Sequence, residues 1–141
     1  MKLLSVLLLC SAVFYVRAQE FSKDKLLSIA NDCKEETGAS DDDVQEMLKH
    51  EPSGSTEAKC MRACLLKKVG IMDANGKLDK DVGAAVVKAK THGDAGQEAI
   101  GIEIMDACAS KMDSDDHCEA AEEFGACIKE QAKEKGFVME E

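Results

Sequence analysis

The 141-residue chain contains no tryptophan, a single tyrosine, and one proline at position 52. Basic residues are also few, since 18 lysines and arginines stand against 28 aspartates and glutamates and give a formal net charge of −10. Nucleic-acid binding relies on positive charge that contacts phosphates and on aromatic rings that stack with bases. The chain is poor in both, so we expect no nucleic-acid partner and no attraction to anionic membranes.

The chain also lacks the pattern of a β-strand and the motifs of catalytic sites. No segment alternates polar and apolar residues over several positions, whereas apolar residues recur at helical spacing. The three histidines, His50, His92 and His117, each lie among polar neighbours, so we expect them to be exposed. We predict an all-α protein that is not an enzyme, with no catalytic residues, no metal ligands and no cofactor.

One loop has the composition of a calcium site but not its ligand pattern. Residues 72–79 place Asp, Asn and Gly at several positions of an EF-hand loop. Its first and twelfth ligands would be Ile71 and Val82, which have no carboxylate to bind the ion. We therefore expect a turn at Asn75 and Gly76, followed by a helix that has Asp79 as its cap.

The N-terminus has the pattern of a secretory signal peptide. Lys2 precedes an apolar run over residues 3–16, and small or aliphatic residues lead to a cleavage site after Ala18. A membrane anchor is the alternative, but the run is shorter than the roughly 20 residues that a spanning helix needs. We expect a signal peptide at 1–18 and one secreted domain at 19–141, without stable insertion in a membrane.

Cleavage would remove Cys10 and leave six cysteines in an oxidising compartment, where disulfides are the expected state. Cys60 and Cys64 lie four residues apart within a helical pattern, which places both thiols on one face of one helix. They reach two other segments more easily than they reach each other. Cys118 and Cys127, nine residues apart on one helix, would lie about 13 Å apart and cannot pair. The remaining pairings stay open.

Capping signals divide the rest of the chain into six short amphipathic helices. The expected helices follow Ser22, Ser40, Ser55, Asp79, Asp94 and Asp116, and the last one ends before Gly136. Ser40 with Asp43 has the pattern of a capping box. Apolar residues at helical spacing mark the inward face of the fourth helix: Val82, Ala85, Val86 and Ala89. On the fifth helix, two adjacent stripes make an apolar face wide enough to be buried on two sides.

The spacing of the six cysteines is similar to that of a known family. Successive gaps are 26, 3, 43, 9 and 8 residues. This pattern closely resembles the six-cysteine insect odorant-binding proteins, and the resemblance covers the mature chain from the first helix to the last. It implies a compact bundle of six short helices around an internal apolar pocket. It also implies the disulfide pairs Cys33–Cys64, Cys60–Cys118 and Cys108–Cys127.

The resemblance implies a function as well. Such a protein would bind small hydrophobic molecules, such as odorants or pheromones, and carry them through an extracellular fluid such as sensillar lymph. Odorant receptors would be the partners that receive them. Two alternatives from other classes stay open: a lipid-binding or membrane-active protein of saposin type, and a disulfide-rich secreted ligand that acts through its surface.

Candidate pocket residues come from the apolar stripes of the expected helices. They are Met47, Leu66, Val69, Leu78, Val82, Val86, Ile102, Met105, Ala109, Phe124 and Ile128. After Gly136 the tail places Phe137, Val138 and Met139 together, and a free tail would leave these three side chains exposed. We expect the tail to act as a lid, with a frayed terminus as the alternative. Protonation of the carboxylates of Glu140 and Glu141 would then weaken the closure as the pH falls.

Overall fold

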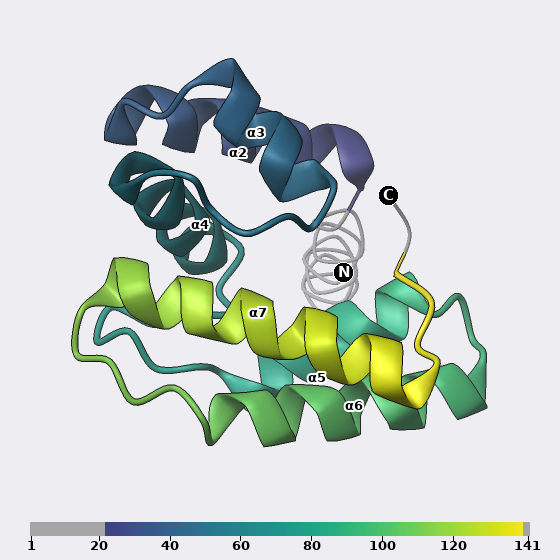
Figure 1. Ribbon diagram of the computed structural model, residues 1–141. Coiled ribbons are helices and arrows are strands. Elements are labelled where there is room, and N and C mark those ends of the chain that lie inside the picture. Colours follow the sequence, from purple (N-terminus) through teal and green to yellow (C-terminus); the bar gives the residue numbers. More distant parts are fainter. Residues whose placement is uncertain (1–21, 140–141) are drawn as a thin grey trace, which may run out of the picture.

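The structure, a computed structural model, describes residues 22–139. In these residues the chain forms six helices and no strand (Figure 1). The helices are α2 (Lys23–Thr37), α3 (Asp41–Leu48), α4 (Thr56–Lys68), α5 (Lys80–Lys90), α6 (Ala95–Ala109) and α7 (His117–Lys135). The predicted all-α architecture of six short helices is confirmed. The predicted signal peptide and the terminal Glu140 and Glu141 lie outside the described residues.

Each helix begins after the capping residue that the sequence predicts. The side chain of each cap accepts a hydrogen bond from a backbone N–H group in the first turn of its helix. The caps are Ser22, Ser40, Ser55, Asp79, Asp94 and Asp116. Ser40 and Asp43 form the predicted capping box, in which each side chain accepts a hydrogen bond from the other residue's backbone N–H. The C-terminal end of α7 is also as predicted. This helix ends at Gly136, whose φ of 68° lies in the left-handed region that glycine adopts without strain.

The loop between α4 and α5 forms the predicted turn. Asp73 Oδ1 accepts hydrogen bonds from the backbone N–H groups of Asn75, at 2.8 Å, and Lys77, at 3.0 Å. A single bridge pairs Met72 with Leu78 on either side of the turn. The carboxylate of Asp73 is therefore bound by the backbone of its own loop.

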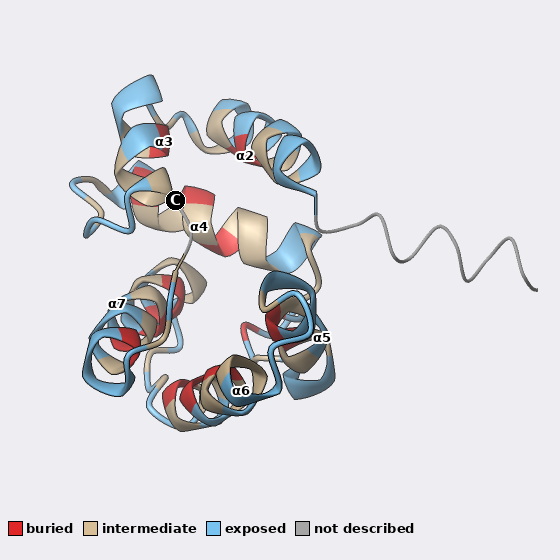
Figure 2. Cartoon of the chain, turned by 90° about the vertical axis from the view of Figure 1, so that its right-hand side faces the viewer, coloured by how far each residue is buried: buried red, intermediate tan, exposed pale blue. Residues whose placement is uncertain are grey.

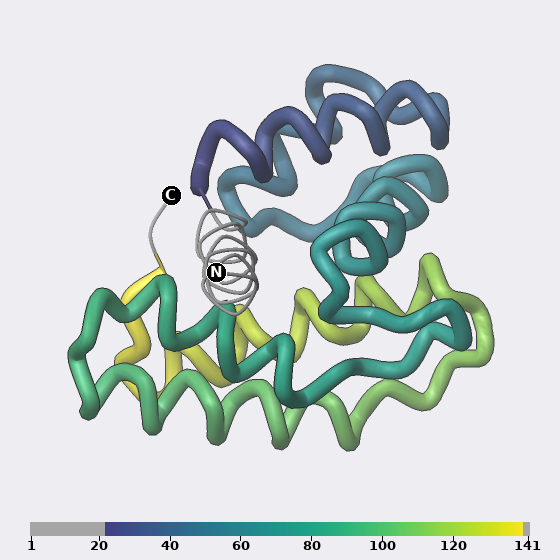
Figure 3. Tube along the Cα trace, turned by 180° about the vertical axis from the view of Figure 1, so that it is seen from behind, coloured from purple at the N-terminus to yellow at the C-terminus, as the bar shows by residue number. Residues whose placement is uncertain are grey.

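Helix α4 lies between two groups of helices. In Figure 1, α2 and α3 cover one side of α4, and α5, α6 and α7 lie on the other; the view from behind in Figure 3 shows the same division. Met61 of α4 is buried in a cluster with residues of α2 and α3. Ala63, Ala120 and Ala121 are buried on the opposite side, where α4 meets α7. One helix thus contributes to two separate parts of the core.

Three disulfides link four of the helices. Cys33–Cys64 joins α2 to α4, Cys60–Cys118 joins α4 to α7, and Cys108–Cys127 joins α6 to α7. These are the pairs that the resemblance implied. The two cysteines of α4 bind two different helices, as their spacing predicted. Helices α3 and α5 take part in no disulfide, so noncovalent contacts such as the Lys34–Asp41 and Lys80–Asp106 ion pairs hold them in place.

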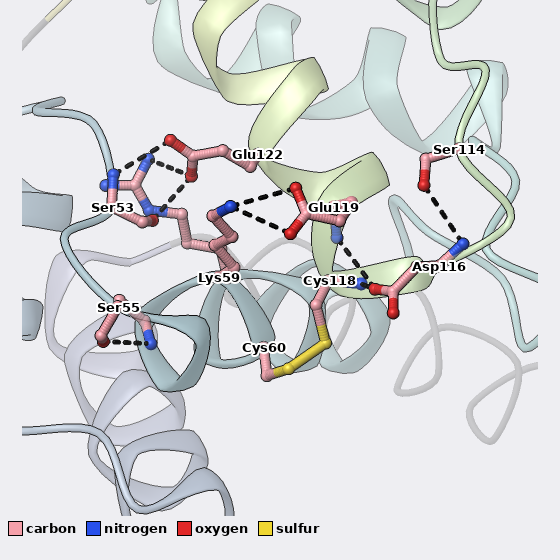
Figure 4. A network of polar contacts seen from close by, with 11 residues as sticks. Ser53, Ser55, Lys59, Cys60, Ser114, Asp116, Cys118, Glu119 and Glu122 are labelled. Atoms are coloured by element: carbon pink, nitrogen blue, oxygen red, sulfur yellow. Dashed lines mark hydrogen bonds and ion pairs between the residues drawn. A yellow bond between two sulfur atoms is a disulfide. The ribbon is translucent and has the colours of Figure 1, made fainter.

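A partly buried polar network joins the segment before α4 to α7 (Figure 4). The Glu122 carboxylate accepts hydrogen bonds from the Ser53 hydroxyl, at 2.6 Å, and the Ser53 backbone N–H, at 3.0 Å. Arg62 Nη1 lies 3.3 Å from the same carboxylate, and the Arg62 guanidinium also donates to the backbone carbonyl of Glu51. The side chains of Arg62 and Glu122 are only 13% and 18% exposed, which limits screening of their charges by water.

The environment of Glu122 makes this network sensitive to acid. Burial raises the pKa of the Glu122 carboxyl, but hydrogen bonds from Ser53 and the charges of Arg62 and Lys59 together lower that pKa below its ordinary value. A group whose pKa is lower in the folded state stabilises the fold above its unfolded pKa, which is near 4.3 for glutamate. That contribution is lost as the pH falls through the lower folded pKa.

Replacement of this carboxylate tests the network. Glu122→Gln should lower the free energy of unfolding by roughly 1–2 kcal/mol at pH 7, because the charge is lost while one hydrogen-bond acceptor remains. Between pH 5 and pH 3 the variant should lose less stability than the wild type, since it has no carboxylate to protonate at this position. Urea unfolding at several pH values measures both effects. Glu130→Gln, at an exposed position of α7, is the control, and equal pH dependence of all three proteins would contradict the argument.

Candidate functional site

Partly buried apolar side chains gather on the side of α4 that faces α5, α6 and α7. They pack against a buried cluster of Ile71, Ile104, Cys108, Phe124, Cys127 and Ala132. We call these partly buried residues the interior set: Leu66, Val69, Leu78, Val82, Val86, Ile100, Met105, Met112, Ile128, Phe137 and Met139. Figure 2 shows these four helices around a common centre. The interior set thus comes from every helix of this group, from the α4–α5 and α6–α7 loops and from the tail.

Most of the predicted pocket residues lie together in this region. The interior set contains Leu66, Val69, Leu78, Val82, Val86, Met105 and Ile128, and Phe124 belongs to the buried cluster itself. The largest fully buried side chains of the described residues are Met61, Met72, Ile104, Cys33 and Cys108. Much of the large apolar surface of the C-terminal helices is therefore only partly covered. These side chains have the apolar chemistry that lines most sites for small molecules.

Three predicted pocket residues lie elsewhere. Met47 packs in the cluster formed by α2, α3 and α4, on the other side of α4. Ile102 and Ala109 are partly buried but belong to none of the clusters, because α6 packs through the stripe that contains Ile104 and Cys108. A helix turns by about 100° per residue, so Ile102 and Ala109 lie roughly 120–140° around the helix from the middle of that stripe. The sequence showed two adjacent apolar stripes on this helix, and the prediction chose residues from the less buried one.

The inward face of α5 also differs from the prediction. Ala85 and Ala89 are exposed, and the buried residues are Gly83 and Val87. A Cβ atom at Gly83 would lie 2.5 Å from Met105 Cε. The missing side chain therefore lets the two helices approach closely. An isolated glycine in a helix is the signal that could have indicated this contact, because such a glycine usually has a packing reason.

The tail packs onto α6 at Gly101. A Cβ atom at Gly101 would lie 2.5 Å from Val87 Cγ1 and 2.9 Å from Phe137 Cε2. The ring of Phe137 thus rests where a larger residue would have its side chain. Neither helical glycine was among the predicted site residues, and both lie in the contact of α5 with α6.

A hydrogen bond holds the tail against the same helix. The Val138 backbone N–H donates to Gln97 Oε1 at 3.2 Å, while Lys135 Nζ, at the end of α7 just before the tail, lies 2.8 Å from Glu103 Oε1. Phe137 and Met139 pack against the buried cluster, whereas Val138 is 71% exposed. The expectation that Val138 is covered with its neighbours is therefore wrong. Successive side chains of an extended segment point to opposite sides, so only the first and third residues of the trio reach the interior.

A depression lies on the outer surface near two of the disulfides. It has a volume of about 330 Å³ and is lined by Glu36, Cys60, Ala63, Cys64, Lys67, Lys68, His117 and Cys118. Its lining combines the charged side chains of Glu36, Lys67 and Lys68 with the apolar surface of Ala63 and the disulfides. His117 is partly buried there, contrary to the expectation of an exposed histidine, because it covers Gly76 and its Nδ1 lies 2.7 Å from Lys67 Nζ.

Residues 22–139 contain neither a metal-binding group nor a membrane-spanning helix. No three or more His, Cys, Asp or Glu side chains in this range are grouped so that they could hold a metal ion. None of the helices of the same range has the length and apolar character required to span a bilayer.

Comparison with known proteins gives the family. Residues 17–131 match the PBP/GOBP family. The chain belongs to this family. It is 41% identical over 136 residues to general odorant-binding protein 28a of Drosophila melanogaster, a match that covers 96% of this chain and 95% of that protein. It is 42% identical over 123 residues to general odorant-binding protein 19d of the same fly, covering 87% and 82% of the two chains.

Solved structures show the same fold. Odorant-binding protein dmelOBP28a from Drosophila melanogaster superposes with a TM-score of 0.76 at 44% identity, covering 84% of this chain and 98% of that one. A pheromone-binding protein of the cockroach Leucophaea maderae gives a TM-score of 0.68 at 23% identity, covering 77% and 92%. This PBP/GOBP member therefore has the insect odorant-binding fold that the cysteine spacing indicated.

The glycine contact between α5 and α6 leads to a prediction. Gly101→Ala should lower the free energy of unfolding by about 1–3 kcal/mol, because the new methyl group overlaps Val87 and Phe137. Gly96→Ala is the matched control on the same helix, since its Cβ would meet only an Asp94 oxygen at 3.4 Å. The control should be neutral or slightly stabilising, as alanine favours helices over glycine. Urea unfolding measures both variants, and equal stability of the two would contradict this account of Gly101.

Proposed function

We propose that this protein carries small hydrophobic molecules, which it binds in the interior between α4, α5, α6 and α7. The observation that carries the proposal is the interior set, in which large apolar side chains from all four helices remain partly uncovered around one buried cluster. Membership of the PBP/GOBP family supports it, since this is a family of binding and carrier proteins. The proposed pocket residues are Leu66, Val69, Leu78, Val82, Val86, Met105, Phe124 and Ile128.

The chemistry of the interior set fits transport better than tight storage. A ligand of about 15–20 heavy atoms that gains roughly 0.3–0.5 kcal/mol per atom binds in the micromolar range. Such a complex forms at low ligand concentration and still dissociates quickly. Met105, Met112 and Met139 add flexible, polarisable side chains that adapt to ligands of different shape. We therefore propose that recognition depends on shape and that selectivity is broad.

We further propose that the protein acts outside the cell. The pattern of residues 1–18 predicts a signal peptide, and three disulfides fit an oxidising compartment. An extracellular fluid such as sensillar lymph is the proposed medium, and odorant receptors are the proposed destination of the ligand. Odorants and pheromones are the proposed ligand classes, because the relatives of this chain are odorant-binding proteins.

The two alternative functions predict different surfaces. A membrane-active protein of saposin type would present a large apolar outer face, but within residues 22–139 the single large hydrophobic side chain that is exposed is Val138. A secreted ligand that acts through its surface would have a filled interior and take up no apolar probe. Probe uptake and vesicle binding therefore separate the three functions.

The test uses the protein secreted by insect cells from the full-length chain. Its mass should correspond to a mature protein that begins at Gln19. The neutral fluorescent probe N-phenyl-1-naphthylamine should bind with a dissociation constant in the micromolar range and be displaced by flexible aliphatic and aromatic ligands of equal size with similar affinity. Absence of probe uptake, or binding to lipid vesicles instead, would reject the carrier function.

The tail is proposed as a lid over this interior. Phe137 and Met139 pack against the buried cluster, and the hydrogen bond from the Val138 N–H to Gln97 fixes the tail along α6. Complete burial of one such side chain contributes roughly 1.5–3 kcal/mol, so the partial burial of two contributes about 2 kcal/mol in total. A lid of this strength can open without unfolding of the bundle.

Truncation after Gly136 tests the lid. The shortened protein should bind N-phenyl-1-naphthylamine roughly tenfold more weakly and release it faster, because the contacts of Phe137 and Met139 are lost. Val138→Ser is the control within the tail, since this exposed side chain should be replaceable without effect. Circular dichroism should show unchanged helix content in both variants. Equal affinity and equal release rates for truncated and full-length protein would mean that the tail is not a lid.

A further inference from the structure

The ligand class that the interior can accept depends on where the charged side chains lie. No polar or charged residue among 22–139 is buried. Sixteen positions of the described chain are lysine or arginine, and all of these except Lys34, Lys59 and Arg62 are exposed. The position of these three side chains, with that of the partly buried His117, therefore decides which ligands the interior can accept.

Each of these four basic side chains already has a partner outside the interior set. Lys34 lies 2.6 Å from Asp41 Oδ1 where α2 meets α3, on the other side of α4. Lys59 and Arg62 pair with Glu119 and Glu122 where α4 meets α7, at 2.9 Å and 3.3 Å. His117 contacts Lys67 in the outer depression. A ligand carboxylate inside the bundle would have to break one of these contacts or remain without a cation.

Helix α6, against which the tail lies, carries several acidic groups. Glu103 of α6 binds Lys135, and Glu98 of the same helix is only partly exposed. The polar side chains near the tail are also engaged, since Gln97 accepts from the Val138 N–H and the Gln131 amide donates to Glu134. The net charge of −10 adds a negative potential over the whole molecule. In the segments outside 22–139 the basic residues are Lys2 and Arg17, both in the predicted signal peptide.

We infer that the interior accepts neutral apolar ligands, such as hydrocarbons, esters and aldehydes, and rejects carboxylates and other anions of the same size. This inference rests on the proposed carrier function and names its ligand class. An unpaired anion loses its hydration on entering an apolar environment and regains little there. A neutral ligand of the same shape loses far less. Discrimination therefore comes from the cost of burying the charge, not from a specific polar contact.

Two probes with the same ring system test the inference directly. N-phenyl-1-naphthylamine is neutral, and 1-anilinonaphthalene-8-sulfonate adds one sulfonate to the same scaffold. At pH 7.5 the neutral probe should bind the mature wild-type protein at least about tenfold more tightly. Equal or tighter binding of the sulfonate would overturn the inference and leave the carrier function intact. Failure of both probes to bind would reject the carrier function itself.

Aliphatic competitors provide a second measurement that needs no variant. Methyl decanoate should displace N-phenyl-1-naphthylamine at pH 7.5 at least about tenfold more effectively than decanoate. Lowering the pH to 5.5 should narrow this gap, because part of the acid becomes neutral, while the affinity of the ester serves as the control for changes in the protein. Decanoate that competes as well as the ester at pH 7.5 would overturn the inference.

A substitution that supplies a cation should reverse the preference. Met105 belongs to the interior set and has nearly the length of lysine, so Met105→Lys should raise the affinity for the sulfonate probe relative to the neutral probe by at least about tenfold. Ala99→Lys places the same charge on an exposed position of α6 and should leave the ratio unchanged. Circular dichroism checks that both variants fold. If Met105→Lys does not fold, the ratio of the two probe affinities in the wild-type protein decides the question. An equal change in both folded variants would contradict a role of the interior.

Discussion

The contact between α4 and α7 is the constraint on which the rest of this structure depends. Ala63, Ala120 and Ala121 are buried there, and such small side chains let the two helix backbones approach closely. The Cys60–Cys118 disulfide fixes the same contact, with Cα atoms 4.3 Å apart. With its position on α7 fixed, α4 presents Met61 to α2 and α3 and Leu66 to the interior. The proposed ligand site thus lies against a helix whose position on α7 is fixed by a disulfide.

The disulfides also help a small domain to remain folded around an internal pocket. A pocket of about 300 Å³, at the small end of the usual range, would cost roughly 7 kcal/mol if it stayed empty and unrelaxed. Three disulfides contribute about 2–4 kcal/mol each by restricting the unfolded chain. The cost of the empty pocket and the stabilisation by the disulfides are comparable. A helical bundle with three disulfides can therefore tolerate an empty pocket that a domain of this size without disulfides could not.

The sequence determined the helices of this protein more reliably than their inward faces. Helix starts depend on local hydrogen bonds of residues such as Ser40 and Asp79, which the pattern of neighbouring residues reveals. Disulfide pairing was not accessible to geometry alone and came from the resemblance of the cysteine spacing to a family. The inward face of α5 was misjudged because alanine is equally at home inside and outside a helix bundle, so Ala85 and Ala89 carried little information.

The remaining misplacements share one physical cause, which is that contacts between distant segments decide them. Gly83 and Gly101 are favourable only because Met105, Val87 and Phe137 occupy the space above them, and none of these contacts lies within one helix. Helix α5 forms no disulfide, so its position depends on this fit with α6 rather than on a covalent link. The same fit seats the tail. The part of the interior where α5, α6 and the tail meet is therefore determined by the fit of side chains from distant segments, which the local sequence pattern does not contain.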